Sequence, residues 1–136
     1  MDLQSLNRSV IEEFRANNGK VTGNFDGMPL LLINTLGAKS GTHYTKPLAY
    51  LADGERFVVI ASYAGHEHNP PWYHNLLAHP DIDIEVGDQV ISVLASVANE
   101  PERSVLFDKM ASVMPVFNDY QSKTTRRIPV VIFART

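Results

Sequence analysis

The apolar residues near the start of the chain recur at the spacing of one helical face: Leu3, Leu6, Val10, Ile11 and Phe14. Asn18-Gly19 follows and is a typical signal for the end of a helix. We therefore predict a helix over about residues 5–18.

Further along, the apolar residues follow the patterns of β-strands. The segment Pro29 to Leu36 (PLLLINTL), which begins with an apolar run, predicts a buried strand. Asp81 to Val86 alternates strictly between acidic and aliphatic residues, which predicts a strand with one face in the core. Tyr44–Leu51 and Arg56–Ser62 are expected to form a hairpin, and Gln89–Ala98 is the expected partner of Asp81–Val86. The last strand is expected at Ile128–Arg135.

Two stretches between these strands predict short helices. Asn69 has the form of an N-cap with Pro70 at the first helical position, and this helix would end near His79. The second helix would start within Asn99–Glu102, where a proline and an acid stand in the first turn, and would run to about Met114.

The tally is six strands, mostly in hairpins, with three or four short helices; the stretch PVFNDYQS after the second long helix is expected to be a turn. Antiparallel hairpins with helices between them indicate a mainly β protein with some α-helix, built as a small closed barrel with helices at its rim. A chain of 136 residues is long enough for one domain, and we expect residues 1–136 to form it.

Composition and charge narrow the class of protein. A net charge of −3 with no basic arm argues against nucleic acid as a partner. The absence of cysteine excludes disulfides, thiolate ligands and a cysteine nucleophile, and it suits the reducing cytosol, so we expect a cytoplasmic protein. The first residues lack the apolar core of a signal peptide, and the longest apolar run is too short for a membrane span.

Four of the five histidines lie in HEHNPPWYHNLLAHP, residues 66–80. His66 and His68 could share a metal ion, but His74 and His79 are five apart on a short helix and face different directions. Because no cysteine is available to complete a site, we predict that no metal is bound.

Trp72 and Asn75 are three apart in the same segment and share a helical face. A tryptophan beside an amide would suit a flat heterocycle with hydrogen-bonding edges. A helix that packs its aromatic face onto a barrel has the same spacing, so the spacing leaves both interpretations open.

In the turn GAKSG, Gly37 and Gly41 bracket Lys39 and Ser40 between two predicted strands. Glycines allow backbone N–H groups to converge, and the lysine and serine add a charge and a hydroxyl, so the turn could hold an anion. A plain hairpin turn with a solvated lysine has the same residues, and chemistry alone favours that simpler reading.

The order of the motifs is more specific than any one of them. The segments PLLLINTLGAKSG, TKPLAYLADGERFVVIAS, HNPPWYHNLLAHPDIDIEVGD and YQSKTTRRIPVVIF follow one another over roughly residues 28 to 134. In this order they resemble the deazaflavin-dependent nitroreductase family, split β-barrel proteins that bind the reduced deazaflavin coenzyme F420 in actinobacteria. The resemblance implies an F420-dependent oxidoreductase in which the cofactor carries the difficult chemistry.

The resemblance also implies roles for single residues. The GAKSG turn would face the phosphate and glutamate tail of the cofactor. The end of the predicted strand Arg56–Ser62 would present backbone N–H groups to the ring, and the segment around Trp72 would complete the pocket. The implied cofactor contacts are Lys39, Ser40, Thr42, His43, Lys46, Pro47, Ala49, Ile60, Ala61, Ser62, Tyr63, Trp72 and Asn75.

Four positions depart from the family pattern. Tyr44 and Tyr63 stand where relatives often carry arginine and lysine near the acidic end of the cofactor. Met114 and Phe117 stand where nitroimidazole-reducing relatives place tyrosines, while Tyr120 remains as a candidate catalytic proton donor. With Met114, Phe117 and Tyr120 as the implied substrate contacts, we expect an apolar electron-poor acceptor, a quinone or an enone.

Two alternatives stay open at this point. Split barrels also bind flavin mononucleotide (FMN), whose phosphate Lys39 and Ser40 would suit, and a non-catalytic deazaflavin carrier or sensor would not need the missing tyrosines. A homodimer is expected from the fold. Peripheral membrane association through Leu6, Val10 and Phe14 is an alternative to docking of that helix face on the barrel.

Overall fold

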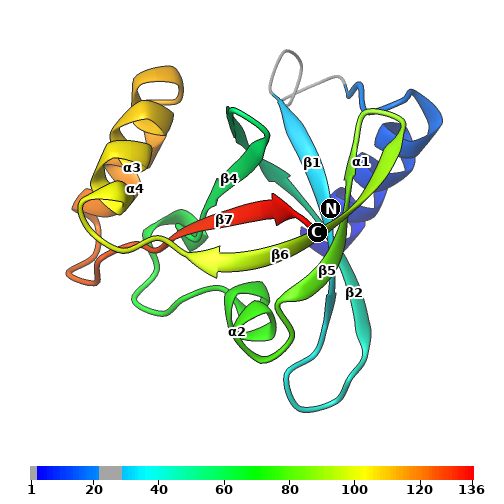
Figure 1. Ribbon diagram of the computed structural model, residues 1–136, viewed down its shortest axis with the longest axis horizontal. Helices are drawn as coiled ribbons and strands as arrows, with labels where there is room; N and C mark the ends of the chain where they lie inside the picture. Colours follow the sequence, from blue (N-terminus) through cyan, green and yellow to red (C-terminus); the bar gives the residue numbers. More distant parts are fainter. Residues whose placement is uncertain (1–2, 22–28) are drawn as a thin grey trace.

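The computed structural model describes residues 3–21 and 29–136, in which a curled antiparallel sheet is surrounded by short helices (Figure 1). The described strands, seven in number, are β1 (Leu30–Leu36), β2 (His43–Ala49), β3 (Leu51–Asp53), β4 (Arg56–Ile60), β5 (Asp81–Val86), β6 (Gln89–Val97) and β7 (Val130–Arg135). The helices are α1 (Leu3–Ala16), α2 (Pro71–Ala78), α3 (Glu102–Val113) and α4 (Val116–Ser122), with a short 3-10 turn η2 (Tyr63–Gly65).

The sheet curls because its two edge strands are consecutive in the chain. The strand order is β2-β1-β5-β6-β7-β4-β3, and only Tyr50 separates β2 from β3. The predicted single strand Tyr44–Leu51 is therefore wrong, and so is the total of six: β2 pairs with β1, and only β3 pairs with β4. Pro47, which has no N–H to donate, is tolerated because β2 has a neighbour on one side only.

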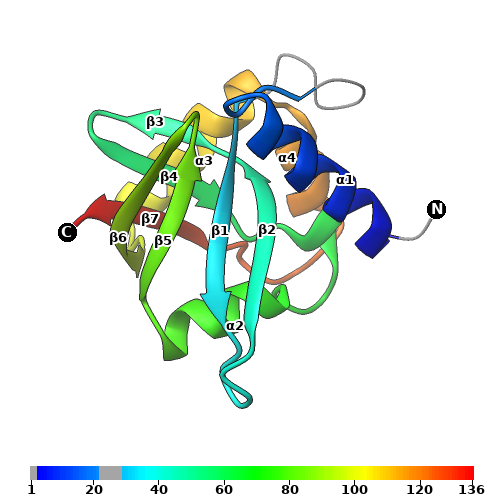
Figure 2. The ribbon, with the colours of Figure 1, turned by 90° about the vertical axis from the view of Figure 1, so that its right-hand side faces the viewer.

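The alternation of side chains along β1 explains why its first four residues, Leu30 to Ile33, are all apolar. Leu31 and Ile33 point into the sheet's concave side, where they pack with Trp72 and Leu76 of α2. Leu30 and Leu32 point to the other face, which α1 covers with Val10 and Phe14 (Figure 2). Both faces of β1 are thus buried, and Val10 and Phe14 of α1 are docked on the sheet. Membrane association of this helix stays a prediction.

A second core lies between the other side of the sheet and the hairpin of α3 and α4. It contains Phe107 and Met110 of α3, Phe117 of α4 and Ile128. The predicted turn PVFNDYQS is wrong, because this stretch forms α4 and buries Phe117 against the strands.

Two helix boundaries also differ from the prediction. Helix α1 ends at Ala16 rather than near residue 18, because Asn18 and Gly19 already have positive φ angles of 55° and 92°. Helix α2 is capped by Pro70, not Asn69, whose side-chain oxygen instead accepts a hydrogen bond from Arg126 at 2.8 Å.

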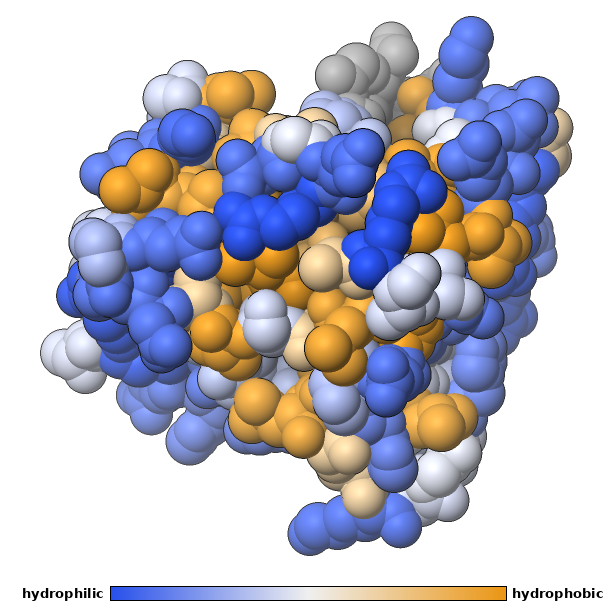
Figure 3. All heavy atoms as spheres, viewed as in Figure 1, coloured by the Kyte–Doolittle hydropathy of each residue, from blue (hydrophilic) through white to orange (hydrophobic). Residues whose placement is uncertain are grey.

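Apolar side chains also reach the surface on the face that carries β6 and α2 (Figure 3). Among the described residues, Leu77 of α2 and Val90 and Leu94 of β6 are each more than two-fifths exposed. Within residues 3–21 and 29–136, no helix has both the length and the apolar character needed to cross a bilayer.

Candidate functional site: a cationic cavity beside the edge strand

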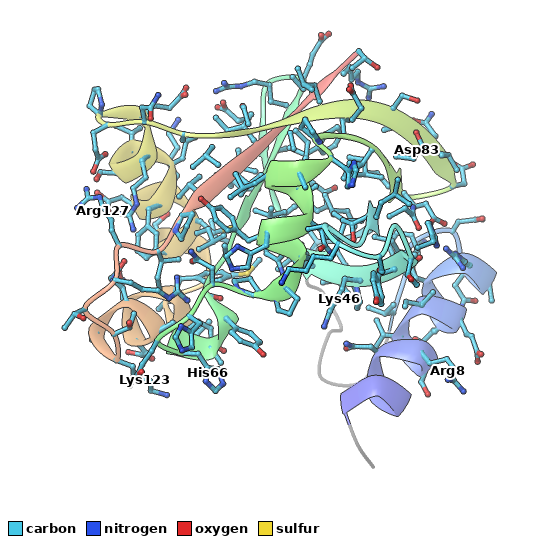
Figure 4. All side chains as sticks on the ribbon, turned by 90° about the horizontal axis from the view of Figure 1, so that it is seen from below. Arg8, Lys46, His66, Asp83, Lys123 and Arg127 are labelled. Carbon is cyan, nitrogen blue, oxygen red and sulfur yellow. The ribbon has the colours of Figure 1, made fainter. Side chains whose placement is uncertain are left out.

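A cavity of about 960 Å³ lies along the free edge of β2, with α1 on one side and α2 on the other. In Figure 4, Lys46 extends from β2 into the space between these two helices. The lining residues are Asn7, Arg8, Ile11, Glu12, Arg15, Thr35, Gly37, Ala38, Lys39, Ser40, Tyr44, Thr45, Lys46, Asn69, Pro71, Trp72, His74 and Asn75. Its volume is at the upper end of the range of small-molecule sites, about 300–1,000 Å³.

The cavity concentrates positive charge in a protein that carries net negative charge. Four cations, Arg8, Arg15, Lys39 and Lys46, line it, against one carboxylate, Glu12, while the whole chain has a net charge of −3. Within the described residues, only Arg15 of these four cations forms a salt bridge. The others are available to an anionic ligand.

The GAKSG turn forms one wall of the cavity through Lys39 and Ser40. Gly41 has a φ of +70°, which favours glycine, and a Cβ added at Gly37 would lie 2.5 Å from the Ser40 hydroxyl, so a larger residue there would displace that hydroxyl. The Ser40 hydroxyl accepts a hydrogen bond from the Thr42 N–H at 3.1 Å. Its own proton remains available to a ligand.

Asn75 joins α2 to this turn. Its side-chain oxygen accepts a hydrogen bond from the Ala38 N–H at 3.0 Å, and its amide nitrogen lies 3.5 Å from the Thr35 hydroxyl. The aromatic wall of the cavity, Trp72, is on the same helix and is 6% exposed. Asn75 therefore fixes the distance between the aromatic wall and the cationic turn.

We expect Asn75→Ala to release the Ala38 amide and lower the free energy of unfolding by about 1 kcal/mol, the usual net value of one hydrogen bond. Amide hydrogen exchange followed by NMR would show faster exchange at Ala38. Asn75→Asp, which keeps an acceptor oxygen, should leave that exchange slow. Equal protection of Ala38 in the parent and in Asn75→Ala would contradict this role.

An ion pair holds the end of α1 over the sheet. Arg15 donates two hydrogen bonds to the Glu85 carboxylate, at 3.0 and 2.8 Å, and Asn34 donates a third at 3.1 Å. The Arg15 hydrogen bond is the main cause that lowers the pKa of Glu85, with a smaller contribution from Asn34 and some opposition from burial.

A carboxyl group with a lowered pKa stabilises the fold above its unfolded pKa, about 4.3 for glutamate, and this stabilisation is lost as the pH falls through the folded-state value. Arg15 is half exposed, so we expect Arg15→Ala to cost only about 0.5–1 kcal/mol at neutral pH. Urea unfolding at pH 7 and at pH 3 tests this. A cost that is the same at both pH values would contradict the pairing.

The structure places the predicted cofactor residues in two groups. Five of them line the cavity: Lys39, Ser40, Lys46, Trp72 and Asn75. Pro47 and Ala49, further along β2, do not line the cavity. Ala49 instead packs against the α1 cluster, as does Leu32, which pairs with Pro47.

The remaining predicted contacts lie elsewhere. Thr42 is exposed in the turn, and His43 lines a separate shallow hollow with Asn34 and Asp83. The segment Ile60–Ser62 is buried at the end of β4, and the exposed Tyr63 places its ring 4.7 Å from that of His66. None of these side chains lines the large cavity, and their roles stay predictions.

The predicted acceptor residues lie in or beside the second core. Met114 and Phe117 are each 8% exposed and pack under the α3–α4 hairpin. Tyr120 is partly buried, with its ring 5.9 Å from that of Phe117 and the Lys123 ammonium 5.9 Å from its own ring. Their contact with an acceptor and the proton donation by Tyr120 stay predictions.

Sequence reasoning missed the contribution of α1. Asn7, Ile11 and Arg15 recur at a spacing of four, with Arg8 and Glu12 beside them, so one helical face lines the cavity. This periodicity is visible in the sequence, but the docking partner of that face is not.

The histidine-rich segment shows no grouping suited to a metal. Among the described residues, no three or more His, Cys, Asp or Glu side chains come together. His74 lines the large cavity, whereas the His66 ring lies beside that of Tyr63, tilted by 41°.

A cavity of this size, with a cationic rim and an aromatic wall, is typical of a site for an anionic and partly aromatic small molecule. The sequence pattern of one protein family, described as F420H(2)-dependent quinone reductase, matches residues 6–135, and the chain belongs to this family. An F420H(2)-dependent quinone reductase of Mycobacterium tuberculosis strain H37Rv is 36% identical over 126 residues, covering 90% of this chain and 85% of that protein.

Solved structures agree with this assignment. An F420-H2 dependent reductase, FDR-A, superposes with a TM-score of 0.72 at 33% identity, over 78% of this chain and 94% of that one. A structure described as a domain-swapped dimer has a TM-score of 0.74 at 30% identity, over 93% of both chains. The family resemblance deduced from the motifs is thus confirmed at the level of F420-dependent reductases, and the described acceptor class is quinone rather than nitro compound.

Proposed function

We propose that this protein binds reduced coenzyme F420 in the large cavity and reduces a quinone. When bound, the reduced deazaflavin supplies a hydride, and the quinone gains that hydride and one proton to become a hydroquinone. The observation that carries the proposal is the excess of cations around an aromatic-walled cavity in an acidic protein of this family.

The residues present fit an anionic cofactor with a flat ring. Lys39, Ser40 and Lys46 would bind the phosphate and the acidic tail through charge-assisted hydrogen bonds. Arg8 of α1 supplies a further cation on the same cavity, which offsets the family's basic residues missing at Tyr44 and Tyr63. Trp72 offers an apolar wall to the ring.

The protein's own task is then to bind and orient, because the cofactor supplies the reducing power. Walls from α1 and α2 reduce the access of water to the ring, and the Asn75 hydrogen bond keeps the two sides of the cavity at a fixed separation. We infer that the curled sheet is that of a split β-barrel, in line with the FDR-A structure. A homodimer stays a prediction.

A binding comparison tests the cofactor assignment. Titration of the protein with oxidised F420 and, separately, with FMN, each followed by ligand fluorescence, should show saturable binding of F420 at one site per chain and much weaker binding of FMN. Tight binding of FMN with no binding of F420 would overturn the proposal in favour of a flavin-binding protein on the same fold.

A further inference from the structure

The segment that joins β4 to α2 is held by one side chain from a distant part of the sequence. Arg126 donates four hydrogen bonds to it: Nη1 to the Ala61 carbonyl at 3.2 Å and to the Asn69 side-chain oxygen at 2.8 Å, Nη2 to the Ser62 carbonyl at 2.7 Å, and Nε to the His66 carbonyl at 2.8 Å. A single planar guanidinium thus fixes both ends of the segment 61–69.

All four acceptors are neutral, and Arg126 forms no salt bridge within the described residues. An arginine in a surface ion pair can be replaced at little cost. A partly buried guanidinium that donates only to carbonyl and amide oxygens acts through geometry instead, since a lysine ammonium cannot place donors at four separate positions in one plane.

The segment needs this restraint because its backbone is unusual. Tyr63 and Ala64 both have positive φ angles, 47° and 53°, which side chains other than glycine rarely adopt. Ser62 before them is in the right-handed region, and an αR–αL succession turns successive N–H groups toward one side. Among the described contacts, the N–H groups of Ser62, Tyr63 and Ala64 form no hydrogen bond with the protein.

The segment ends at the wall of the cavity. Asn69 and Trp72 both line it, and the Asn69 oxygen is occupied by Arg126, which turns the Asn69 amide nitrogen away from the guanidinium. We propose that Arg126 is a positioning residue for the cofactor site: it holds the segment 61–69 so that Asn69 and Trp72 keep their places in the cavity wall. This role rests on the proposed function.

Trp72 is the one tryptophan of the chain, and it reports this positioning without any cofactor. Its side chain is buried, so its emission should shift to longer wavelength and become more easily quenched by acrylamide in Arg126→Ala. Arg127→Ala is the matched control: it removes the neighbouring arginine, which pairs with Glu100 and bonds Ser104 and lies away from Lys46 in Figure 4.

The same variants are then titrated with oxidised F420. We expect Arg126→Ala to bind about 10-fold more weakly or worse, because small displacements of positioning groups have large effects, while Arg127→Ala binds like the parent. Added guanidinium should restore both the Trp72 emission and part of the affinity in Arg126→Ala, whereas sodium chloride at the same concentration should not. Arg126→Lys, which keeps the charge, should resemble Arg126→Ala.

The outcomes separate the two proposals. If the parent binds F420 and Arg126→Ala has the same affinity and the same Trp72 emission, Arg126 is not a positioning residue and the proposed function stands. If Arg126→Ala is unfolded by circular dichroism, Arg126→Lys and the guanidinium rescue decide, and a lysine variant that behaves like the parent overturns the proposal. If the parent itself does not bind F420, the proposed function fails and this role with it.

Discussion

Replacement of Lys39 and Lys46 together by alanine is expected to weaken the binding of oxidised F420 about 100-fold at low salt, which corresponds to about 2.7 kcal/mol. Each lysine lines the cavity and neither forms a salt bridge within the described residues. A charge-assisted hydrogen bond to a phosphate or carboxylate contributes roughly 1.5–3 kcal/mol, and solvent exposure places these two near the lower limit.

The dependence on salt concentration tests whether the two lysines attract the cofactor electrostatically. The Debye length falls from about 10 Å at 0.1 M to about 3 Å at 1 M salt, so the difference between parent and variant should shrink as salt is added. The control is Lys20→Ala/Lys109→Ala, which removes two exposed lysines that do not line the cavity. If both double variants lose affinity equally, net charge rather than the cavity attracts the cofactor.

Arg103→Ala is expected to lower the free energy of unfolding by about 3 kcal/mol. The side chain is 8% exposed and donates two hydrogen bonds to the Ile128 carbonyl, at 3.1 and 2.8 Å, and one to the Gln121 side chain at 3.0 Å. Its guanidinium also lies 4.5 Å from the centre of the Phe107 ring. Truncation would leave buried acceptors without a donor and a void under α3.

The loss should appear as a decrease of roughly 10 °C in the midpoint of thermal unfolding, with F420 affinity at 20 °C little changed because Arg103 does not line the cavity. Arg127→Ala again serves as control, since its exposed ion pair should contribute less than about 1 kcal/mol. A loss below that value for Arg103→Ala would show that the core under α3 adapts to the change.

Most of the strand positions could be predicted because their patterns depend on local burial. The alternation of Asp81–Val86 required one buried face, and Ile82 and Ile84 are indeed buried. The break at Tyr50 could not be predicted in this way, because it results from closure of the curled sheet, in which β2 and β3 pair with strands at opposite ends of the order. Local patterns contain no information on such long-range pairing.

The sequence predicted those residues of the candidate site that stand in short family motifs. Lys39, Ser40, Trp72 and Asn75 stand in motifs of the family, and all four line the cavity. Arg126 also stands in one of these motifs, but its four acceptors lie about sixty residues earlier in the chain. Spacing along the sequence cannot reveal a contact of that kind.

Met114 and Phe117 show where inference from a family resemblance reaches its limit. The resemblance gave them an acceptor-binding role because of where tyrosines stand in relatives, whereas the structure packs both into the second core. Met114 follows the end of α3 and Phe117 lies in α4. Apolar side chains where two helices pack on a sheet are typical of a core, and a functional role for them needs evidence beyond residue type.

The most direct test of the proposed hydride transfer is a rapid-mixing measurement of reduced F420 with an apolar quinone, with and without the protein. Return of the oxidised deazaflavin absorbance reports the transfer, and one hydroquinone should form for each F420 oxidised. We predict that the rate increases with protein concentration and saturates with quinone. Binding of reduced F420 without any acceleration of its oxidation, for a panel of quinones, would contradict the enzyme assignment and identify a deazaflavin carrier.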